Sequence, residues 1–197
     1  LAVQYGVRPA EVPTTGRQVT GFFDKSPLAA QLCNLECNAT AAVSISHHFV
    51  QKMQEDKLRG AIVFTSSAAA MMPGPFSVMY ASSKAFMSQF AASLAAEVKS
   101  KGIDVCAVHP SPVASNFYDK AHKLDAMEFF KQFSVSPDAL PDVIFASIGR
   151  SVLRDIGGVC IMFRLVTKFV DTNFLAMITA ATAHTMADYK RYSSGGK

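Results

Sequence analysis

The fold is decided by the stretch GAIVFTSS, residues 60–67, together with a second apolar run, IDVCAVH, at residues 103–109. The first run is short and follows a charged turn, which is typical of a strand buried on both faces of a parallel sheet. Pro110 and Pro112 end the second run, which predicts another such strand. The pair Gly157-Gly158 leads into a further apolar run, so we expect a third strand at residues 159–163.

Helical patterns separate these runs. Apolar residues recur at helical spacing over residues 27–54 and lie on most sides of residues 76–99. Ser136-Pro137-Asp138 combines an N-cap, a proline at the first helical position and an acid, so a helix should start there and run to about Leu153. The alternation predicts one α/β domain over residues 1–197 with a parallel sheet. Sites in such sheets form beyond the carboxyl ends of the strands, which are Thr65-Ser66-Ser67 and His109-Pro110-Ser111 here.

Composition narrows the classes of protein and partner. Half of the 197 residues are hydrophobic, 17% are charged and the net charge is +4, which indicates a globular chain. The basic residues are scattered without a run of five like charges, so we expect no nucleic-acid partner, while a weak attraction to an anionic membrane stays open. Arg164, Lys168 and Asp171 interrupt the apolar stretch 159–186, and the remainder is too short for a spanning helix.

The four cysteines lack the CxxC spacing of many metal and redox sites. Buried free thiols in a reducing compartment are the favoured interpretation. Cys33 and Cys37, with His47 and His48 ten residues on, would form a metal site only if helical phase brought the two pairs together. We therefore predict no metal site.

Chemistry is indicated by Tyr80-Ala81-Ser82-Ser83-Lys84, because a Tyr and a Lys at i and i+4 project from one helix face. A phenol has a pKa near 10, and a neighbouring ammonium lowers it, so the pair suits acid–base catalysis on a carbonyl or alcohol. Ser67 ends the preceding strand and can orient a substrate oxygen toward the Tyr. The alternatives are a helix-surface pair for Tyr80 and Lys84 and a strand-end cap for Ser67.

These motifs resemble the short-chain dehydrogenases/reductases, whose pattern appears here as IVFTSS (62–67), YASSK (80–84) and VCAVHPSPVASNF (105–117). The segment Asn34-Leu35-Glu36-Cys37-Asn38-Ala39-Thr40 is similar to the one that carries the family's catalytic Asn, and Asn38 lies 29 residues before Ser67. The resemblance implies a Rossmann-type doubly wound parallel sheet and a nicotinamide cofactor. It covers almost the whole chain, as the C-terminal two-thirds of the family's fold.

The family's roles carry over by resemblance. Tyr80 would donate a proton to the carbonyl oxygen, and Lys84 would lower the Tyr pKa and bind the nicotinamide ribose. Ser67 would orient the carbonyl, and Asn38 would hold a water in a relay to the Lys. The cofactor-binding residues would be Tyr80 and Lys84 with Pro110, Val113 and Ser115. Asn38 could instead be a polar residue that kinks its helix, and Asn38-Ala39-Thr40 is also a glycosylation sequon, a use we do not expect.

Two departures from the family's pattern stand out. Ser111 replaces the Gly of the family's Pro-Gly and adds a side chain where the backbone approaches the nicotinamide. The glycine-rich turn that cradles the pyrophosphate is absent, and Val3-Gln4-Tyr5-Gly6 stands where the family has Asn-Asn-Ala-Gly. We therefore expect the fold to be N-terminally incomplete, without its first nucleotide-binding strands and helices. The 197-residue chain alone should have little or no activity.

Finer similarity points to the branch of very-long-chain 3-oxoacyl-CoA reductases and 17-beta-hydroxysteroid dehydrogenases, through GVRP (6–9), Pro13, FFD (22–24) and residues 101–117. The branch implies reduction of a 3-oxoacyl-CoA or steroid ketone, with NADP favoured over NAD. It also implies the cytosolic face of the endoplasmic reticulum membrane, with the cytoplasm as the alternative. The family implies a homodimer through residues 28–54 and 76–99 and a substrate lid at 116–134. The competing hypothesis is a catalytically inactive, truncated protein that binds a lipid or a partner.

Overall fold

A three-stranded parallel sheet is the centre of the computed structural model, which describes residues 19–115 and 124–194. The strands β1 (Gly60–Thr65), β2 (Ile103–Pro110) and β3 (Leu153–Ile156) lie in the order β1-β2-β3. β1 pairs with β2 from Gly60 opposite Ile103 to Thr65 opposite Val108. The first two strands therefore lie where the sequence predicts them.

The prediction of the third strand is wrong. Residues Leu153–Ile156 form β3, whereas the apolar run 159–163 belongs to helix α6 (Gly158–Phe169). Gly157, with φ +88°, separates the two elements, because a left-handed residue can end a strand and reverse the chain. The preceding helix starts at Ser136 as predicted, but α5 (Leu140–Ser147) ends six residues before Leu153, ahead of Gly149 at φ +75°.

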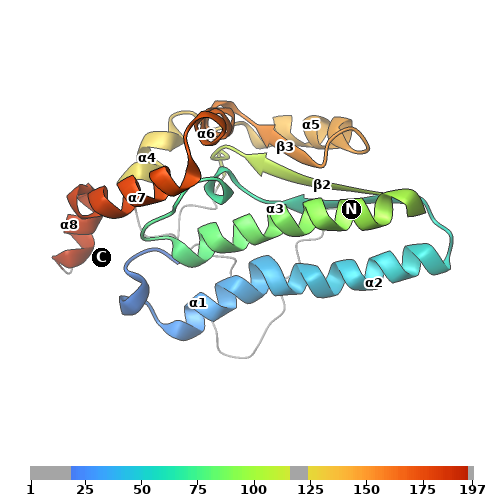
Figure 1. The fold of residues 1–197 in the computed structure, drawn as a ribbon, viewed down its shortest axis with the longest axis horizontal. Helices are drawn as coiled ribbons and strands as arrows, with labels where there is room; N and C mark the ends of the chain where they lie inside the picture. The colour runs from blue at the N-terminus through green and yellow to red at the C-terminus, as the bar shows by residue number, and fades with distance from the viewer. Residues whose placement is uncertain (1–18, 116–123, 195–197) are drawn as a thin grey trace.

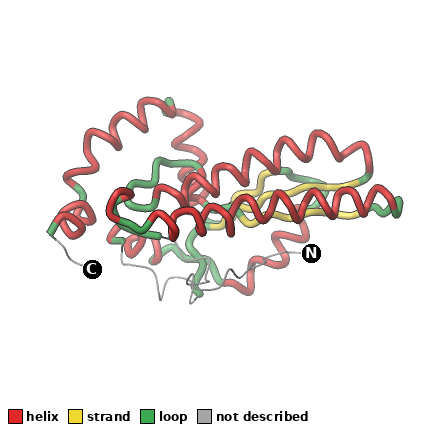
Figure 2. Tube along the Cα trace, turned by 90° about the horizontal axis from the view of Figure 1, so that it is seen from below, coloured by secondary structure: helices red, strands yellow, loops and turns green. Residues whose placement is uncertain are grey.

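The helices cover both faces of the sheet (Figures 1 and 2). α1 (Leu28–Leu35) continues through the π-helical turn η2 (Glu36–Thr40) into α2 (Ala41–Glu55), and α3 (Val78–Val98) connects β1 to β2. The C-terminal part contains α4 (Asp125–Lys131), α5, α6, α7 (Thr172–Thr182) and α8 (Ala187–Ser193). This is the doubly wound α/β arrangement that the resemblance implies.

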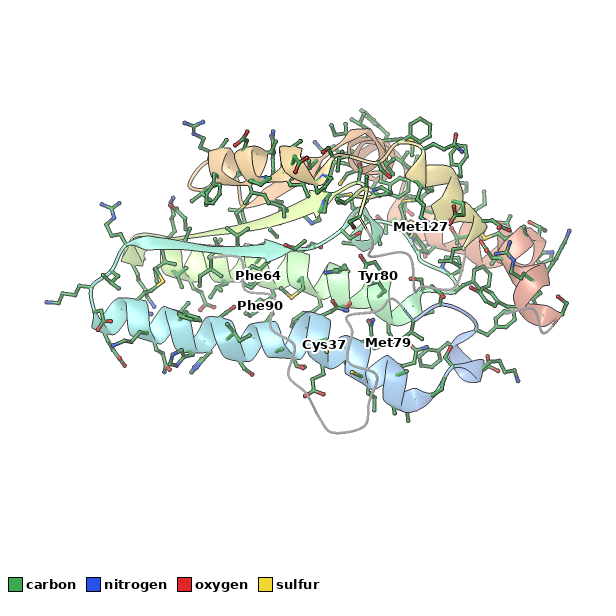
Figure 3. The ribbon with its side chains drawn as sticks, turned by 180° about the vertical axis from the view of Figure 1, so that it is seen from behind. Cys37, Phe64, Met79, Tyr80, Phe90 and Met127 are labelled. Carbon is green, nitrogen blue, oxygen red and sulfur yellow. The ribbon has the colours of Figure 1, made fainter. Side chains whose placement is uncertain are left out.

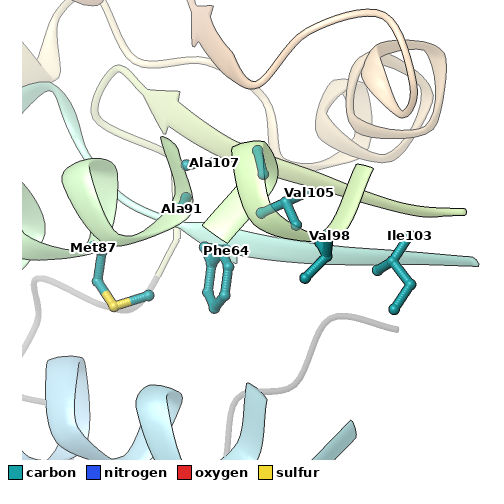
Figure 4. Packing of buried hydrophobic residues seen from close by; sticks show 8 residues of the cluster. Phe64, Met87, Ala91, Val98, Ile103, Val105 and Ala107 are labelled. Carbon is teal, nitrogen blue, oxygen red and sulfur yellow. The ribbon is translucent and has the colours of Figure 1, made fainter. Parts of the chain in front are cut away.

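One face of the sheet packs against α3, and the opposite face against α5. Phe64 of β1 and Val105 of β2 contact a cluster from α3 that includes Met87, Ala91 and Val98 (Figure 4). The second cluster joins Cys106, Val108 and Ile156 to half-buried side chains of α5, which are Leu140, Val143 and Ile144. β2 is buried on both faces and reads as a nearly continuous apolar run, whereas in β1 Phe64 is buried and the residues before it are half-buried.

Some of the predicted features lie outside the described residues. They are Val3-Gln4-Tyr5-Gly6, the motif at 6–9, Pro13 and residues 116–123 of the expected lid. The rest of that lid, residues 124–134, contains α4. Within the described parts of the chain, no helix combines the length and apolar character needed to cross a bilayer.

Candidate active site

The candidate site forms where β1 ends and α3 begins. Ser66 and Ser67 follow the last residue of β1, and the chain returns through Pro73-Gly74-Pro75 to the start of α3 at Val78. Gly74 allows this return, since a Cβ there would lie only 2.8 Å from the Cβ of Ala81. Tyr80 therefore lies in the first turn of α3, beyond the carboxyl end of β1 (Figure 3).

Tyr80 and Ser67 lie together, as predicted from their spacing. Tyr80 is 9% exposed, and its side chain forms a hydrogen bond with Ser67. The Ser67 hydroxyl also accepts a hydrogen bond from the backbone amide of Ala69, at 3.2 Å, so it caps the short helix η3 (Ala68–Ala70) as well. Burial raises the pKa of Tyr80 above its usual value near 10, and the bond with Ser67 only partly opposes this. Tyr80 is therefore a protonated phenol at neutral pH.

Lys84 lies one turn beyond Tyr80 on α3. Its ammonium is 5.7 Å from the centre of the Tyr80 ring and donates a hydrogen bond of 2.8 Å to the carbonyl of Thr65 at the end of β1. Burial lowers the pKa of Lys84 to about 8. The expectation that Lys84 lowers the Tyr80 pKa is not met in this arrangement, because the amine lies over the ring face and desolvation of the phenol dominates.

Asn38 lies in the π-helical turn η2, which packs against α3. Its side-chain amide donates a hydrogen bond of 3.2 Å to the side-chain oxygen of Asn34 one turn earlier. The amide of Ala41 reaches back five residues to the carbonyl of Glu36, which widens the helix at this point. Single π-turns inside α-helices are often found at functional sites. The irregular helix around Asn38 is thus observed, and its role as a site residue stays a prediction.

The loop after β2 carries the remaining predicted cofactor residues. Pro110 ends β2, Val113 forms an isolated bridge with Val135, and Ser115 is exposed. Ser111 is 2% exposed, and its hydroxyl accepts a hydrogen bond of 3.0 Å from the Cys160 amide in the first turn of α6. The Ser111 side chain, which replaces the expected Gly, is thus hydrogen-bonded to the first turn of α6.

A second polar cluster lies behind the first and was not predicted. Ser66, Ser88 and His109 are linked by hydrogen bonds of 2.9 Å between the two hydroxyls and 2.8 Å between Ser88 and the His109 ring. One indication of it is present in the sequence, a histidine near the end of a mostly apolar strand. Its partners come from distant parts of the chain, so spacing alone could not reveal them.

The donors present suit the nicotinamide end of a dinucleotide. A cation on Lys84, a phenol on Tyr80 and the backbone of residues 110–115 lie at the carboxyl ends of neighbouring parallel strands, where such ligands bind. The Cys33 and Cys37 sulfurs are 4.0 Å apart. Within residues 19–115 and 124–194, no three His, Cys, Asp or Glu side chains converge as a metal site.

Comparison with known proteins gives one family model and several relatives. The family model described as short chain dehydrogenase matches residues 12–125, more than half of the chain. The 17-beta-hydroxysteroid dehydrogenase type 3 of Mus musculus is 33% identical over 102 residues, which are 50% of this chain and 33% of that protein. The very-long-chain 3-oxoacyl-CoA reductase of Anas platyrhynchos is 47% identical over 60 residues, 30% of this chain and 19% of that protein. The matched segments span a third or less of these relatives.

A solved structure shows the same fold. The short-chain dehydrogenase from Burkholderia cenocepacia, in complex with NADP, superposes with a TM-score of 0.66 at 16% identity, covering 81% of this chain and 62% of that chain. At this identity the likeness concerns the fold alone.

Proposed function

Because the chain belongs to the short-chain dehydrogenase family, we propose that the protein reduces a ketone on a lipophilic substrate with a nicotinamide cofactor. One observation carries the proposal. Ser67, Tyr80 and Lys84 come together at the carboxyl end of β1, with a hydroxyl bonded to a buried phenol and a cation over its ring. A ketone needs a proton at its oxygen as hydride reaches its carbon, and the Tyr80 phenol holds a proton beside the Ser67 hydroxyl.

Each residue has a distinct part in this chemistry. The cofactor supplies the hydride. Tyr80 holds the proton that the carbonyl oxygen receives, and the Ser67 hydroxyl donates a second hydrogen bond that orients the oxygen. Lys84 would bind the nicotinamide ribose hydroxyls, as the family's pattern implies, and its ammonium lies 5.7 Å from the centre of the Tyr80 ring. Asn38 would hold a water near Lys84 for reprotonation.

The cofactor is proposed to be NADPH, held by Tyr80, Lys84 and the loop with Pro110, Val113 and Ser115. The structural relative from Burkholderia cenocepacia and another from Sphingobium yanoikuyae, the latter with a TM-score of 0.63, are complexes with NADP and NADPH. Ser111 supports this placement, because its hydroxyl is buried and bonded to the Cys160 amide of α6.

The substrate class follows from the relatives and from the apolar surroundings of the site. The curated relatives act, by name, on 17-beta-hydroxysteroids or on very-long-chain 3-oxoacyl-CoA. An apolar cavity of about 400 Å³ lies between α3, the loop before it and α7, lined mainly by Ala, Pro and Met side chains. Phe129 and Phe133 near α4 add exposed apolar surface. A 3-oxoacyl-CoA or a steroid ketone would suit these surroundings.

The setting of the protein is proposed on the family's pattern. By resemblance to the branch that reduces lipophilic ketones, the protein would be located at the cytosolic face of the endoplasmic reticulum membrane. A homodimer would form through the helices α1–α2 and α3, where Leu28, Leu32 and Phe86 are exposed. Sedimentation of the purified protein at micromolar concentration would show a single species of twice the chain mass.

NADPH oxidation by the full-length protein tests the proposed reaction, with a long-chain 3-oxoacyl-CoA and a 17-ketosteroid as substrates. Tyr80→Phe should lower kcat by about 10²- to 10⁴-fold while circular dichroism is unchanged, because only the proton donor is lost. Tyr189→Phe is the matched control, since that ring packs on Phe22 outside the site. Retention of more than about a tenth of the rate by Tyr80→Phe would refute general acid catalysis by this phenol.

A further inference from the structure

A chain of polar side chains crosses the interior behind the candidate site. His109 on β2 is 1% exposed, with Nε2 2.8 Å from the Ser88 hydroxyl on α3. Its Nδ1 is 3.4 Å from Oδ1 of Asp155 on β3, out of line for a hydrogen bond but close enough for charge attraction. Two nitrogens of Arg164 on α6 bind the same carboxylate at 2.9 and 3.0 Å. Four elements are thus connected through one imidazole.

The other end of this chain reaches the backbone of the catalytic helix. The Ser88 hydroxyl lies 3.0 Å from the carbonyl of Lys84, and the Ser66 hydroxyl lies 2.8 Å from the same oxygen. Ser66 directly follows β1, next to Ser67. Its hydrogen bond therefore attaches the turn of α3 that contains Lys84 to the end of β1. The ammonium of Lys84 also binds this strand end, through the carbonyl of Thr65.

The order Ser88, His109, Asp155 is that of a hydrolytic triad, but the surroundings exclude that use. His109 is sealed in the interior, and the Ser88 hydroxyl is surrounded by His109, Ser66 and the Lys84 carbonyl. None of the three residues lines the apolar cavity between α3 and α7 or the cavity between α2 and β1. The buried imidazole therefore serves to hold Ser88 and not to activate it toward a substrate.

We infer that His109 is a positioning residue, which acts through Ser88 to hold the Lys84 turn of α3 against the end of β1. This holds the ammonium of Lys84 over the Tyr80 ring. The inference rests on the proposed function, since it assigns to His109 the alignment of the proposed proton donor and its cation.

The charges around the ring decide its protonation state. Asp155 on β3 and Arg164 on α6 face it from one side and the hydroxyls of Ser88 and Ser66 from the other. Burial lowers the pKa of His109 below its usual value of about 6.5, and the attraction of Asp155 only partly opposes this. The ring is therefore neutral at pH 7. Because the Ser88 hydroxyl donates to the Lys84 carbonyl, the ring proton is placed on Nε2, which donates to the Ser88 oxygen. Ser66 donates to the same carbonyl.

The test uses four variants of the full-length protein. Ser88→Ala removes the link to α3, and His109→Leu removes it from the strand side. His109→Gln is the conservative variant, because its amide places a polar atom near the position of Nε2 and keeps a partner for Ser88. Ser93→Ala is the matched control, since Ser93 is exposed on the same helix outside the network.

Two measurements distinguish positioning from a general loss of stability. The pKa of the Lys84 amine is obtained from the pH dependence of its acylation by a small anhydride, followed by mass spectrometry. Steady-state kinetics at saturating NADPH give kcat and KM. We expect Ser88→Ala and His109→Leu to raise the Lys84 pKa from about 8 by about half a unit or more, because a loosened turn admits water. They should lower kcat about tenfold, whereas His109→Gln and Ser93→Ala should change neither quantity.

The double variant Ser88→Ala/His109→Leu should lose about tenfold in kcat, as each single variant does, because the two residues act through one link. A loss near 100-fold, or singles with an unchanged Lys84 pKa, would overturn the inference. The acylation measurement needs no turnover. A wild-type protein without ketone reduction would therefore refute the proposed function, while the labelling would still decide the role of His109.

Discussion

The helices on the two sides of the sheet bury their apolar side chains to very different extents. On α3, Met87, Ala91 and Val98 are at most 3% exposed. On the C-terminal helices, Phe169 is 86% exposed and Met177 63%, and α7 has no buried residue. The face of α3 that meets the sheet is thus closely packed, whereas α6 and α7 present a large apolar surface.

The proposed site needs a rigid catalytic group and an apolar surface for the substrate, and these two features lie on different helices. The proton donor and its cation lie on α3, where close packing keeps their geometry fixed. The apolar surface lies on α6 and α7, and α7 borders the cavity that also touches α3. Exposed apolar patches of this kind commonly mark binding surfaces, which supports the proposal of a lipophilic substrate. Substitutions on the two sides should therefore have different consequences.

The largest expected effect is on the packed side. Phe64→Ala should lower the free energy of unfolding by about 3–5 kcal/mol, because Phe64 is buried against α3 and its loss leaves a cavity. Urea denaturation followed by circular dichroism measures this. A loss below about 1 kcal/mol would mean that the α3 side is as open as the other.

The junction between β3 and α6 should give the next largest effect. Gly157→Ala should lower the free energy of unfolding by about 1–3 kcal/mol, because φ is +88° and the new Cβ would lie 2.6 Å from the Ser111 hydroxyl. Gly158→Ala is the matched control, since nothing lies within 4 Å of a Cβ there. Equal melting temperatures for the two variants would contradict a rigid start of α6.

A smaller effect should appear in the pH dependence of stability. The native pKa of His109 lies below its unfolded value near 6.5, so the unfolded state binds the proton more readily. Stability contributed by the neutral ring is therefore lost as pH falls below about 6.5, by at most about 1.4 kcal/mol per pH unit. The pKa of Asp155 is also lowered, because its bonds to Arg164 outweigh burial, but that effect appears only below about pH 4.

Denaturant titrations between about pH 7 and pH 5 measure the contribution of this one ring. His109→Gln should remove the corresponding part of the slope, whereas His47→Gln, an exposed position on α2, should leave it unchanged. The same slope in wild type and His109→Gln would show that His109 takes up its proton without cost to the fold.

The smallest effect is expected on the open side. Phe174→Ala on α7 should change the free energy of unfolding by less than about 0.5 kcal/mol, because the ring is already more than half exposed. Its effect should instead appear as weaker binding of a long-chain acyl-CoA, measured by calorimetry. Destabilisation like that of Phe64→Ala would show that this surface is part of the core.

The sequence predicts the parts of the molecule that depend on local patterns. β1, β2 and α3 and the group Ser67, Tyr80 and Lys84 follow from apolar runs, turn residues and helical spacing. β3 was missed because an edge strand with Arg154 and Asp155 lacks an apolar run, as edge strands often do. The apolar run at 159–163 is one part of an amphipathic helix, and five residues are too few to distinguish a strand from a helix.

The polar network could not be predicted for a different reason. His109 and Asp155 are directly opposite each other in the register of β2 and β3, although 46 residues separate them. Their pairing depends on a strand position that the sequence pattern does not give. The burial that raises the Tyr80 pKa is likewise a product of packing, so spacing predicts the residue but not its electrostatics.

The π-turn at Glu36–Thr40 joins α1 and α2 into one continuous helix. The side chains of α2 are rotated about the helix axis relative to those of α1. One residue turns an α-helix by about 100°, so the wider turn offsets the faces of its two halves. With this offset, Val50 and Met53 of α2 pack against the core that contains Phe64. Deleting one residue between Glu36 and Thr40 could leave an unbroken helix, yet every side chain of α2 would point about 100° away from its present neighbours. A single residue of chain length thus sets the orientation of fifteen others.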